Sequence, residues 1–474
     1  MVDFQSSRSP RDGTADPALA ETATLPLSTP ARGSHWKQRS ALIAAVVFFA
    51  AMTWPFLRCG ADSEFIVCYL RAAKRMQSGQ AIHRDEPVAY AYPPAMAMLA
   101  MPLARLPTFA ALGVWYLVNI AAVTAVVVGS WRLVGGPPIT RLAGHWLVVF
   151  WLAVALGFRF VSAPLENQQF DVVIAALLIF GCQKLARGCT LAGAVWLGAA
   201  AAMKCTPLLF APYLVWRGRL KAACLLALVA VALNRLPDFV WPQNNGQSYL
   251  GDWCGTFLAK VGRTAPGVWD SDLVLNQSLA GLVNRFAQAG LPLSSDRLPR
   301  GDAVLAPETV AAMRWLTYGI ALALVAATAW RFGRPGREWS RLEVGAESAA
   351  VVCLMLLLSP MSSKAHYVVL VLPCILFARW FVERRQAVGQ AFQPDSQASL
   401  RRPLTALLAV LLVTGPLTSK GLTGKALGDL TLAWGFPTWF ALALLAVTWL
   451  ILPRTRAKSS PEVEPALVQT GKAA

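Results

Sequence analysis

The sequence predicts an all-α polytopic membrane protein, and three observations lead to this prediction. Of its 474 residues, 56% are hydrophobic and only 14% are charged, whereas soluble domains carry about 25% charged residues. The mean hydropathy is +0.49. Apolar runs also alternate with clusters of Lys and Arg along most of the chain. A water-soluble chain of this length needs far more polar surface, so the soluble class is excluded.

The positive charge of the chain follows the pattern of membrane topology. The sequence has 43 Lys and Arg against 25 Asp and Glu, a formal net charge of +18. Such an excess could indicate a nucleic-acid partner, but the cations stand mostly between apolar runs, as the positive-inside rule requires. We therefore expect cytoplasmic loops and no nucleic-acid partner. The nine Cys include no CxxC pair, so no metal site and no cofactor are expected.

About twelve crossings, with both termini in the cytoplasm, satisfy the alternation of cations and apolar runs. The predicted spans are 41–57, 110–129, 145–161, 170–182, 190–203, 207–216, 222–236, 310–330, 346–358, 366–381, 403–413 and 434–452. Together they make a transmembrane domain over residues 41–452, expected in the inner (plasma) membrane. The flanking segments 1–40 and 453–474 are predicted to be disordered cytoplasmic tails.

Two external segments and one broken helix complete the predicted topology. Residues 58–108 form the first external loop, in which several prolines break an apolar stretch and indicate an interfacial or re-entrant element. Residues 237–307 form the largest external segment. The runs 190–203 and 207–216 are short for spans, since about 20 residues cross a membrane. We expect them to be a broken pair that meets at Lys204 near the outer side.

Five polar clusters fall on the predicted external side although they are far apart in the sequence. They are Asp62 with Glu64, Glu166 to Gln169, Lys204, Asn276 to Ser278, and Ser359 to His366. Polar loops alone could produce each cluster, but together they predict a common cavity for a polar ligand. Lys204 and Arg159 stand among apolar neighbours. An ionisable residue at membrane depth indicates a function. Snorkelling to the headgroups is an alternative for both, and an ion pair with a nearby carboxylate such as Glu166 is a further alternative for Lys204.

Several motifs now carry a resemblance to a known family. They occur in order between about residues 60 and 370: an early acidic residue followed by Tyr69, Ala72-Ala73, Gly79, Tyr90 and Tyr92-Pro93-Pro94, then Asn167-Gln168, the stretch Ala200 to Pro207, Asn276-Gln277-Ser278-Leu279, and Ser359-Pro360. In this order the chain resembles the family-87 glycosyltransferases, integral membrane enzymes of the GT-C class. The resemblance implies a GT-C-like fold that acts in building the cell envelope.

The resemblance also implies a reaction. Such enzymes transfer a sugar, typically mannose, from a polyprenyl-phosphate donor to a lipid or glycan acceptor on the non-cytoplasmic side. They use an Asp at the start of the first external loop as a general base or an electrostatic anchor. Asp62 matches that placement. Glu64 is its rival, because the family Asp commonly stands closer to the following Tyr, here Tyr69.

The chemistry of the transfer assigns roles to the remaining polar residues. An acceptor hydroxyl needs a carboxylate to take its proton during inverting transfer, which Asp62 or Glu64 could supply. A departing lipid phosphate needs cations at headgroup depth. The candidates are Lys204 first, then Arg159, Lys364 and His366. The candidates for binding sugar and acceptor are Asn167, Gln168, Asn276, Gln277, Tyr69 and Tyr92.

A secondary transporter or a flippase for a lipid-linked or anionic substrate is the main alternative, and a polymer ligase that uses the same lipid carrier is a further one. Broken helices and buried cations suit a transporter as well, but transporters tend to show internal repeats and sites at the bilayer midplane. The sequence shows no such repeat, and its polar clusters gather at one predicted face. The pattern therefore favours an interfacial enzyme whose partners are the lipid-linked donor, the acceptor and the membrane lipids.

Overall fold

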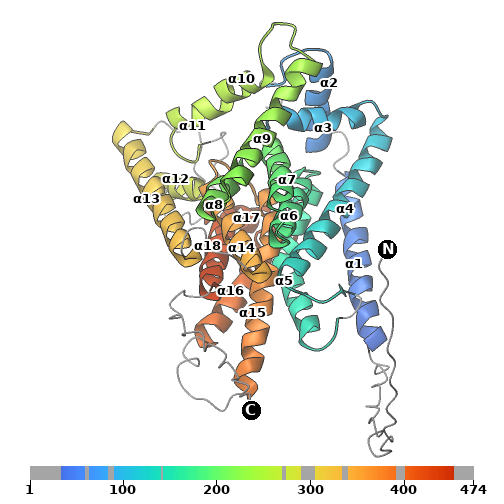
Figure 1. Ribbon diagram of the computed structural model, residues 1–474, viewed down its shortest axis with the longest axis vertical. Helices are drawn as coiled ribbons and strands as arrows, with labels where there is room; N and C mark the ends of the chain where they lie inside the picture. Colours follow the sequence, from blue (N-terminus) through green and yellow to red (C-terminus); the bar gives the residue numbers. More distant parts are fainter. Residues whose placement is uncertain are drawn as a thin grey trace, which may run out of the picture.

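Helices make up all the regular secondary structure of the described part of the chain in the computed structural model (Figure 1). The described residues are 34–58, 63–83, 90–139, 142–268, 274–289, 305–333, 340–390 and 401–452. The first elements are α1 (Ser34–Arg58), η2 (Phe65–Leu70), α2 (Arg71–Gln77), α3 (Pro94–Ala104), α4 (Thr108–Leu133), α5 (His145–Glu166), α6 (Asp171–Ala186), α7 (Thr190–Met203), η4 (Thr206–Leu209), α8 (Phe210–Trp216) and α9 (Leu220–Val240). The remaining elements are α10 (Tyr249–Trp253), η5 (Cys254–Leu258), α11 (Ala259–Arg263), α12 (Leu279–Ala289), α13 (Pro307–Phe332), α14 (Arg341–Leu358), η7 (Lys364–Leu370), α15 (Val371–Gln390), α16 (Arg401–Leu417), α17 (Lys420–Ala433) and α18 (Phe436–Ile451).

Each predicted apolar run coincides with a helix, but the structure also shows helices where none was predicted, such as α12 in the large external segment. α1 begins at Ser34, so the predicted disordered segment is wrong for residues 34–40, where Lys, Gln and Arg are good helix formers. α17 occupies residues 420–433, which were not predicted to be helical because they lack a continuous apolar run. The rest of the predicted tails, 1–33 and 453–474, lies outside the described residues.

The helix lengths support a membrane protein. Fewer helices are long enough to cross a membrane than the twelve crossings that the sequence predicts. Five helices of the described residues are long and apolar enough to cross a membrane, or six if the bent α16 and α17 pair is one span. Others are shorter; α7, for example, has 14 residues, and about 20 are needed to cross the hydrocarbon core. The twelve crossings therefore stay a prediction.

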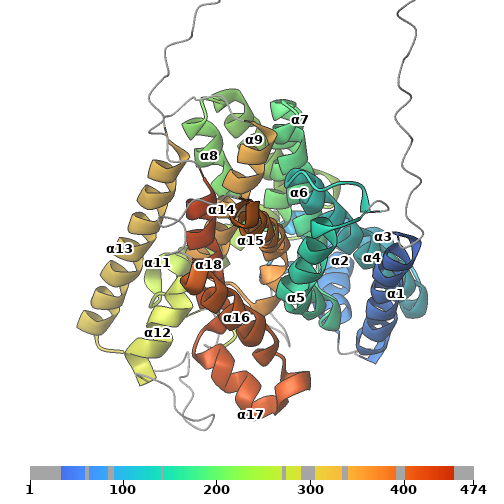
Figure 2. The same ribbon diagram turned by 90° about the horizontal axis from the view of Figure 1, so that it is seen from below.

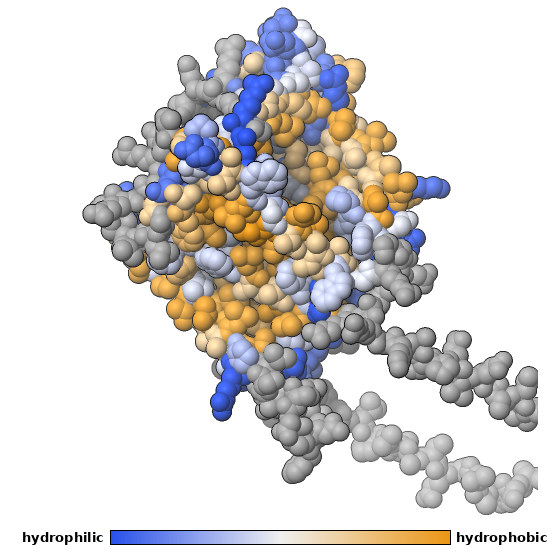
Figure 3. Space-filling view, turned by 90° about the vertical axis from the view of Figure 1, so that its left-hand side faces the viewer, coloured by the Kyte–Doolittle hydropathy of each residue, from blue (hydrophilic) through white to orange (hydrophobic). Residues whose placement is uncertain are grey.

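One face of the bundle is apolar between two polar edges. Figure 3 shows this belt on the face that lies at the left of Figure 1. α13 contributes to the exposed apolar surface, since Trp315 and Trp330 are 80% and 75% exposed. Soluble monomers rarely expose a large contiguous apolar patch. The belt is the surface expected of a protein surrounded by lipid.

The helices pack as a bundle in which α13 and α1 stand at opposite edges (Figure 1 and Figure 2). α7 packs against α6 and α9, α5 packs against α15 and η7, and α14 packs against α18. α14, α15 and α18 lie near the middle when the bundle is seen from below (Figure 2). Elements from both halves of the chain therefore meet around the interior.

Two long-range hydrogen bonds each join segments that the predicted topology places on the same side of the membrane. At one end of α14, Arg217 Nη2 donates a hydrogen bond to the carbonyl of Phe332 (2.9 Å), which joins two segments predicted to be cytoplasmic. Beyond the other end of α14, the backbone N–H of Gln277 donates to the carbonyl of Ser362 (2.6 Å), which joins two segments predicted to be external. These two contacts are consistent with two opposite faces of the helix bundle. Which of the two faces is cytoplasmic stays a prediction.

A helix break occurs at Lys204, where the sequence predicts one. α7 ends at Met203, and Lys204 has extended backbone angles (φ −157°, ψ 125°). The 3₁₀ turn η4 follows with Pro207 in its first turn. Proline lacks a backbone N–H and disfavours a helical conformation in the residue before it, so the helix cannot run on unbroken. The break turns the Lys204 side chain toward the interior.

Candidate active site

Glu64 is the centre of the first polar group, and a π-helix builds it. Glu64 immediately precedes η2, a π-helix, in which residues five apart share a face. Tyr69 therefore lies over Glu64, and its hydroxyl donates to Glu64 Oε1 (3.1 Å). The hydroxyl of Tyr92 donates to the same oxygen (3.2 Å), and the Gln169 amide donates to Oε2. Three donors from three segments hold this carboxylate.

The surroundings of Glu64 change its acidity. Burial raises the pKa of Glu64 above the ordinary value of 4.5, and the hydrogen bond from Gln169 opposes this effect. The negative charge of Asp171 raises the pKa further, whereas the two tyrosine hydroxyls lower it. The result is a raised pKa. A carboxylate whose pKa is closer to the working pH is better matched to accepting a proton.

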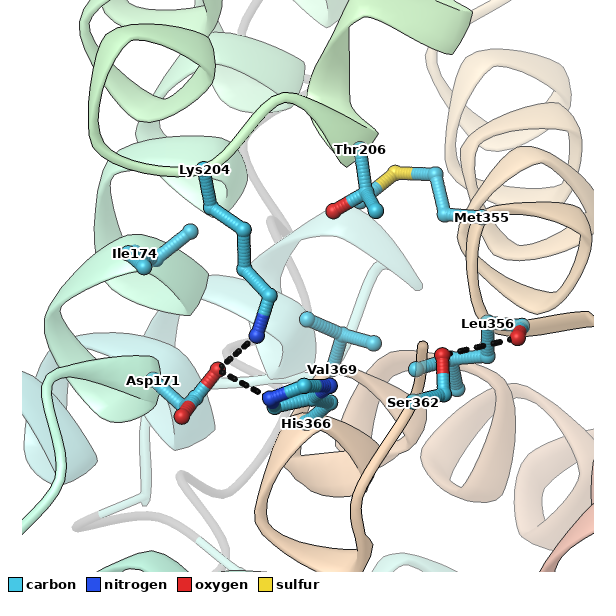
Figure 4. Close-up of a pocket in the computed structure, with 9 residues that line it drawn as sticks. All are labelled: Asp171, Ile174, Lys204, Thr206, Met355, Leu356, Ser362, His366 and Val369. Carbon is cyan, nitrogen blue, oxygen red and sulfur yellow. Dashed lines mark hydrogen bonds and ion pairs between the residues drawn. The ribbon is translucent and has the colours of Figure 1, made fainter. Parts of the chain in front are cut away.

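The second polar group, called the Asp171 group, consists of Asp171, Lys204 and His366 (Figure 4). Lys204 Nζ lies 2.8 Å from Asp171 Oδ1. His366 Nδ1 accepts the backbone N–H of Ser363 (3.0 Å), so Nε2 carries the proton of the neutral ring. Nε2 lies 3.8 Å from Asp171 Oδ1. The other Asp171 oxygen, Oδ2, is buried without a hydrogen-bond partner, so this carboxylate is only partly satisfied.

The two groups adjoin each other and a small cavity. Lys204 Nζ lies 5.9 Å from the centre of the Tyr92 ring, the same tyrosine that donates to Glu64. Asp171 is close enough to act on the charge of Glu64. The cavity is lined by Asp171, Ile174, Lys204, Thr206, Met355, Leu356, Ser362, His366 and Val369 (Figure 4). Residues as far apart in the sequence as Glu64 and His366 therefore meet in one place. We call the two polar groups together the polar centre.

The structure brings together five of the predicted site residues and leaves others elsewhere. Those in the polar centre are Glu64, Tyr69, Tyr92, Lys204 and His366. Asp62 lies outside the described residues. Asn167 is half-buried at the end of α5. The Gln168 amide donates to the carbonyl of Phe56, so its side chain contacts α1.

The side-chain amides of Asn276 and Gln277 were expected to contact sugar. In the structure they form hydrogen bonds with the backbone. Asn276 Nδ2 donates to the carbonyls of Gly267 (2.9 Å) and Pro360 (2.8 Å). Its Oδ1 accepts the backbone N–H of Ser362 (3.1 Å). The amide of Gln277 donates to two further backbone carbonyls. These residues therefore hold the loop from Ser359 to Ser363 that leads to His366.

Sequence reasoning missed Asp171 and Gln169. Asp171 opens the apolar helix α6 and is only 3% exposed. The signal was available, because a carboxylate at the start of a predicted span is as unusual as Lys204 in its apolar context. Gln169 belongs to the polar cluster before α6, but only the tertiary structure selects it over its neighbours as the donor to Glu64.

Arg159 and Lys364 lie in a neighbouring charged group. Arg159 Nη1 donates to Ser162 Oγ (3.0 Å) and to Glu166 Oε1 (3.1 Å). Lys364 opens η7, two residues before His366. No group of three or more His, Cys, Asp or Glu in the part of the chain that the structure describes is arranged to hold a metal ion.

Comparison with known proteins gives the chain its family. The sequence profile described as "Glycosyltransferase family 87" matches residues 90–360. The chain belongs to glycosyltransferase family 87. This confirms the resemblance seen in the motifs. In this family-87 member the matched residues include Tyr92, Asp171, Lys204 and Asn276, while Glu64 precedes the matched region and His366 follows it.

A curated relative extends over most of this family-87 chain. It is the polyprenol-phosphate-mannose-dependent alpha-(1-2)-phosphatidylinositol pentamannoside mannosyltransferase of Mycobacterium tuberculosis. The two are 27% identical over 370 residues, which cover 75% of this chain and 74% of the relative. No solved structure matches the chain significantly.

Proposed function

We propose that this family-87 glycosyltransferase transfers a hexose, with mannose the expected sugar, from a polyprenyl-phosphate donor to a lipid or glycan acceptor on the non-cytoplasmic side of the inner membrane. The family supports sugar transfer. The name of the mycobacterial relative, which states its dependence on polyprenol-phosphate mannose, supports the donor class. The apolar belt and the spanning helices support chemistry on lipid-linked substrates at a membrane surface.

The observation that carries the proposal is the carboxylate of Glu64, held by three hydrogen-bond donors beside the Asp171 group. In the reaction the acceptor hydroxyl attacks the anomeric carbon, and Glu64 takes its proton. The bond between the anomeric carbon and the phosphate oxygen breaks, and the phosphate leaves with the electron pair. Attack opposite the leaving group inverts the anomeric centre.

Lys204 and His366 are the cationic and donor groups that would meet the leaving phosphate. Asp171 holds the Lys204 ammonium at the cavity, and the protonated Nε2 of neutral His366 lies close to the same carboxylate. Fixed positive charge and N–H donors stabilise negative charge that develops as a bond breaks. Because Asp171 already balances part of that charge, the phosphate would share Lys204 with it.

The test is sugar transfer by purified full-length protein in detergent, with radiolabelled polyprenyl-phosphate mannose as donor. We expect Glu64→Gln to lower the rate by about 10²-fold or more, the scale of general base catalysis. The control is Glu308→Gln, which changes an exposed carboxyl in the first turn of α13. An active Glu64→Gln variant together with an inactive Asp62→Asn variant would transfer the role of base to Asp62. Near-normal rates in both variants would overturn the proposal.

A further inference from the structure

One buried asparagine of α9 joins two segments that lead into the polar centre. Asn234 is only 5% exposed. Its Oδ1 accepts the backbone N–H of Ala95 at the start of α3 (2.9 Å). Its Nδ2 donates to the carbonyl of Ala202 near the end of α7 (3.1 Å) and to the carbonyl of Ala230 within α9 (2.9 Å). α9 packs against both α3 and α7 (Figure 1), and this amide bridges all three helices.

The bridge pairs backbone groups of the kind that a helix end leaves without a partner. The first N–H groups and the last carbonyls of a helix have no acceptor or donor within it. α3 begins at Pro94, and its N-cap residue, Pro93, makes no side-chain hydrogen bond to it. α7 ends at Met203, one residue after Ala202. Asn234 therefore contributes a cap to one helix start and one helix end at once.

The anchor at Ala95 determines where Tyr92 lies. The Pro93-Pro94 pair joins the two residues, and each proline ring fixes its own φ angle near about −65°. On the other side of Tyr92, the indole Nε1 of Trp253 in α10 donates to the carbonyl of Ala91 (2.9 Å). Tyr92 is therefore held from both sides, by α9 and by α10.

The anchor at Ala202 acts in the same way on Lys204, which follows two residues later. α7 also lies close to α9 at Gly198, where a Cβ would stand 2.7 Å from the carbonyl of Leu226. Such close packing leaves α7 little freedom to slide along α9. Lys204 Nζ lies 5.9 Å from the centre of the Tyr92 ring. The same amide thus holds the segments of both partners in this contact.

We propose that Asn234 is a positioning residue for sugar transfer and acts through Tyr92 and Lys204. Removal of the amide lets α3 and α7 shift against each other, and a displacement of about 1 Å is enough to weaken a catalytic contact. The hydrogen bond from the Tyr92 hydroxyl to Glu64 (3.2 Å) is one that such a shift would break. This inference rests on the proposed function, because the role of Glu64 is taken from it.

The test compares the pH dependence of transfer in Asn234→Leu, in Tyr92→Phe and in the variant that carries both changes. Leucine is similar in size to asparagine but forms no side-chain hydrogen bond. The acidic limb of kcat/KM reports the ionisation of Glu64. The groups that face Glu64 or act on its charge are Tyr69, Tyr92, Gln169, Asp171, Lys204 and Cys68.

A change in the placement of Tyr92 or Lys204 has the same sign at Glu64. Loss of a hydrogen-bond donor or of a nearby cation disfavours the ionised carboxylate, so the pKa of Glu64 rises. We expect Asn234→Leu to move the acidic limb to higher pH by about 0.5 to 1 unit, the size of one hydrogen bond expressed as a pKa shift. The value of kcat/KM at the optimum should fall by about 10-fold or more. In the variant with both changes, the limb should move by less than the sum of the two single shifts, because both act through one hydrogen bond.

The matched control is Gln183→Leu. The amide of Gln183 in α6 donates to the carbonyl of Gly129 in α4 (3.1 Å), so it also joins two helices. It stands twelve residues after Asp171 in α6, which is about 18 Å along a helix. We expect this change to lower stability but to leave the acidic limb and the rate per folded enzyme unchanged.

The outcomes decide the inference in either direction. An unmoved limb with an unchanged rate per folded enzyme in Asn234→Leu overturns it, and so do fully additive shifts with Tyr92→Phe. An equal shift in Gln183→Leu would assign the effect to a general loosening of the bundle and overturns it as well. If Asn234→Leu does not fold, Asn234→Ser replaces it in the same scheme, because the shorter side chain cannot reach both backbone groups.

A wild-type protein that transfers no sugar would overturn the proposed function but not the bridge. Thermal unfolding in detergent then measures the bridge without turnover. The losses of stability in Asn234→Leu and Tyr92→Phe should be non-additive when the two residues are coupled. Additive losses would show that Asn234 does not act on Tyr92.

Discussion

Two buried charge groups at opposite ends of α14 differ in how completely they are satisfied. Glu347 near the start of α14 pairs with Arg217, and these side chains are 2% and 1% exposed. Tyr213 also donates to Glu347 (3.0 Å), and Arg217 donates to the carbonyl of Phe332 (2.9 Å). Leu356, nine residues and about 13 Å further along the helix, lines the cavity of the Asp171 group.

The difference distinguishes a structural ion pair from a candidate binding site. In the Arg217 and Glu347 pair, both carboxylate oxygens of Glu347 accept hydrogen bonds. The Asp171 group adjoins a cavity and leaves Asp171 Oδ2 buried and unpaired. A closed pair has no capacity left for a ligand, whereas an incomplete one does. We therefore expect the first pair to determine stability and the second group to determine catalysis.

The largest effect is expected at the closed pair. Glu347→Gln leaves the buried guanidinium of Arg217 without its counter-ion, which should lower stability by about 3 to 5 kcal/mol. Replacing both partners, by Arg217→Met with Glu347→Leu, should recover most of this loss, since no buried charge remains. Thermal unfolding of the detergent-solubilised variants measures both. A single variant as stable as wild type would show that this pair is not needed for the fold.

The same double-substitution scheme should give a different result at the open group. Lys204→Gln should reduce transfer by about 10²-fold, the scale of a lost electrostatic contact to the developing charge. Lys204→Gln with Asp171→Asn removes both charges and should recover stability but not activity. Lys204→Arg keeps the charge and should retain part of the donor affinity. Recovery of transfer in the double variant would make this pair structural, like the first.

The smallest effect concerns the pH dependence of transfer. Glu64 must be ionised to accept a proton, and its pKa is raised above 4.5, chiefly by burial. Activity is therefore expected at higher pH and should fall as the pH drops through this raised pKa. Tyr92→Phe removes a donor that favours the ionised form, so the acidic limb of kcat/KM should move to higher pH. A limb that stays in place would separate Tyr92 from the acidity of Glu64.

Much of the candidate site was visible in the sequence as polar residues in unusual places. Lys204 stood out because its neighbours are apolar, and the structure puts it at a helix break beside a cavity. Asn276 was predicted to bind sugar, and its side chain is hydrogen-bonded to loop backbone in the structure. Its polarity marked it as important, but an amide that binds a sugar and one that binds a loop carbonyl look the same in a sequence.

The sequence by itself determined the apolar helices, the break at Lys204 and the apolar surface, since these depend on hydropathy and on proline within a few residues. Only the tertiary structure decided which charges meet. Asp171 pairs with Lys204 across 33 residues, and Glu347 pairs with Arg217 across 130. Such pairs depend on how helices pack against one another, and the energy of a buried charge depends on its neighbours in space.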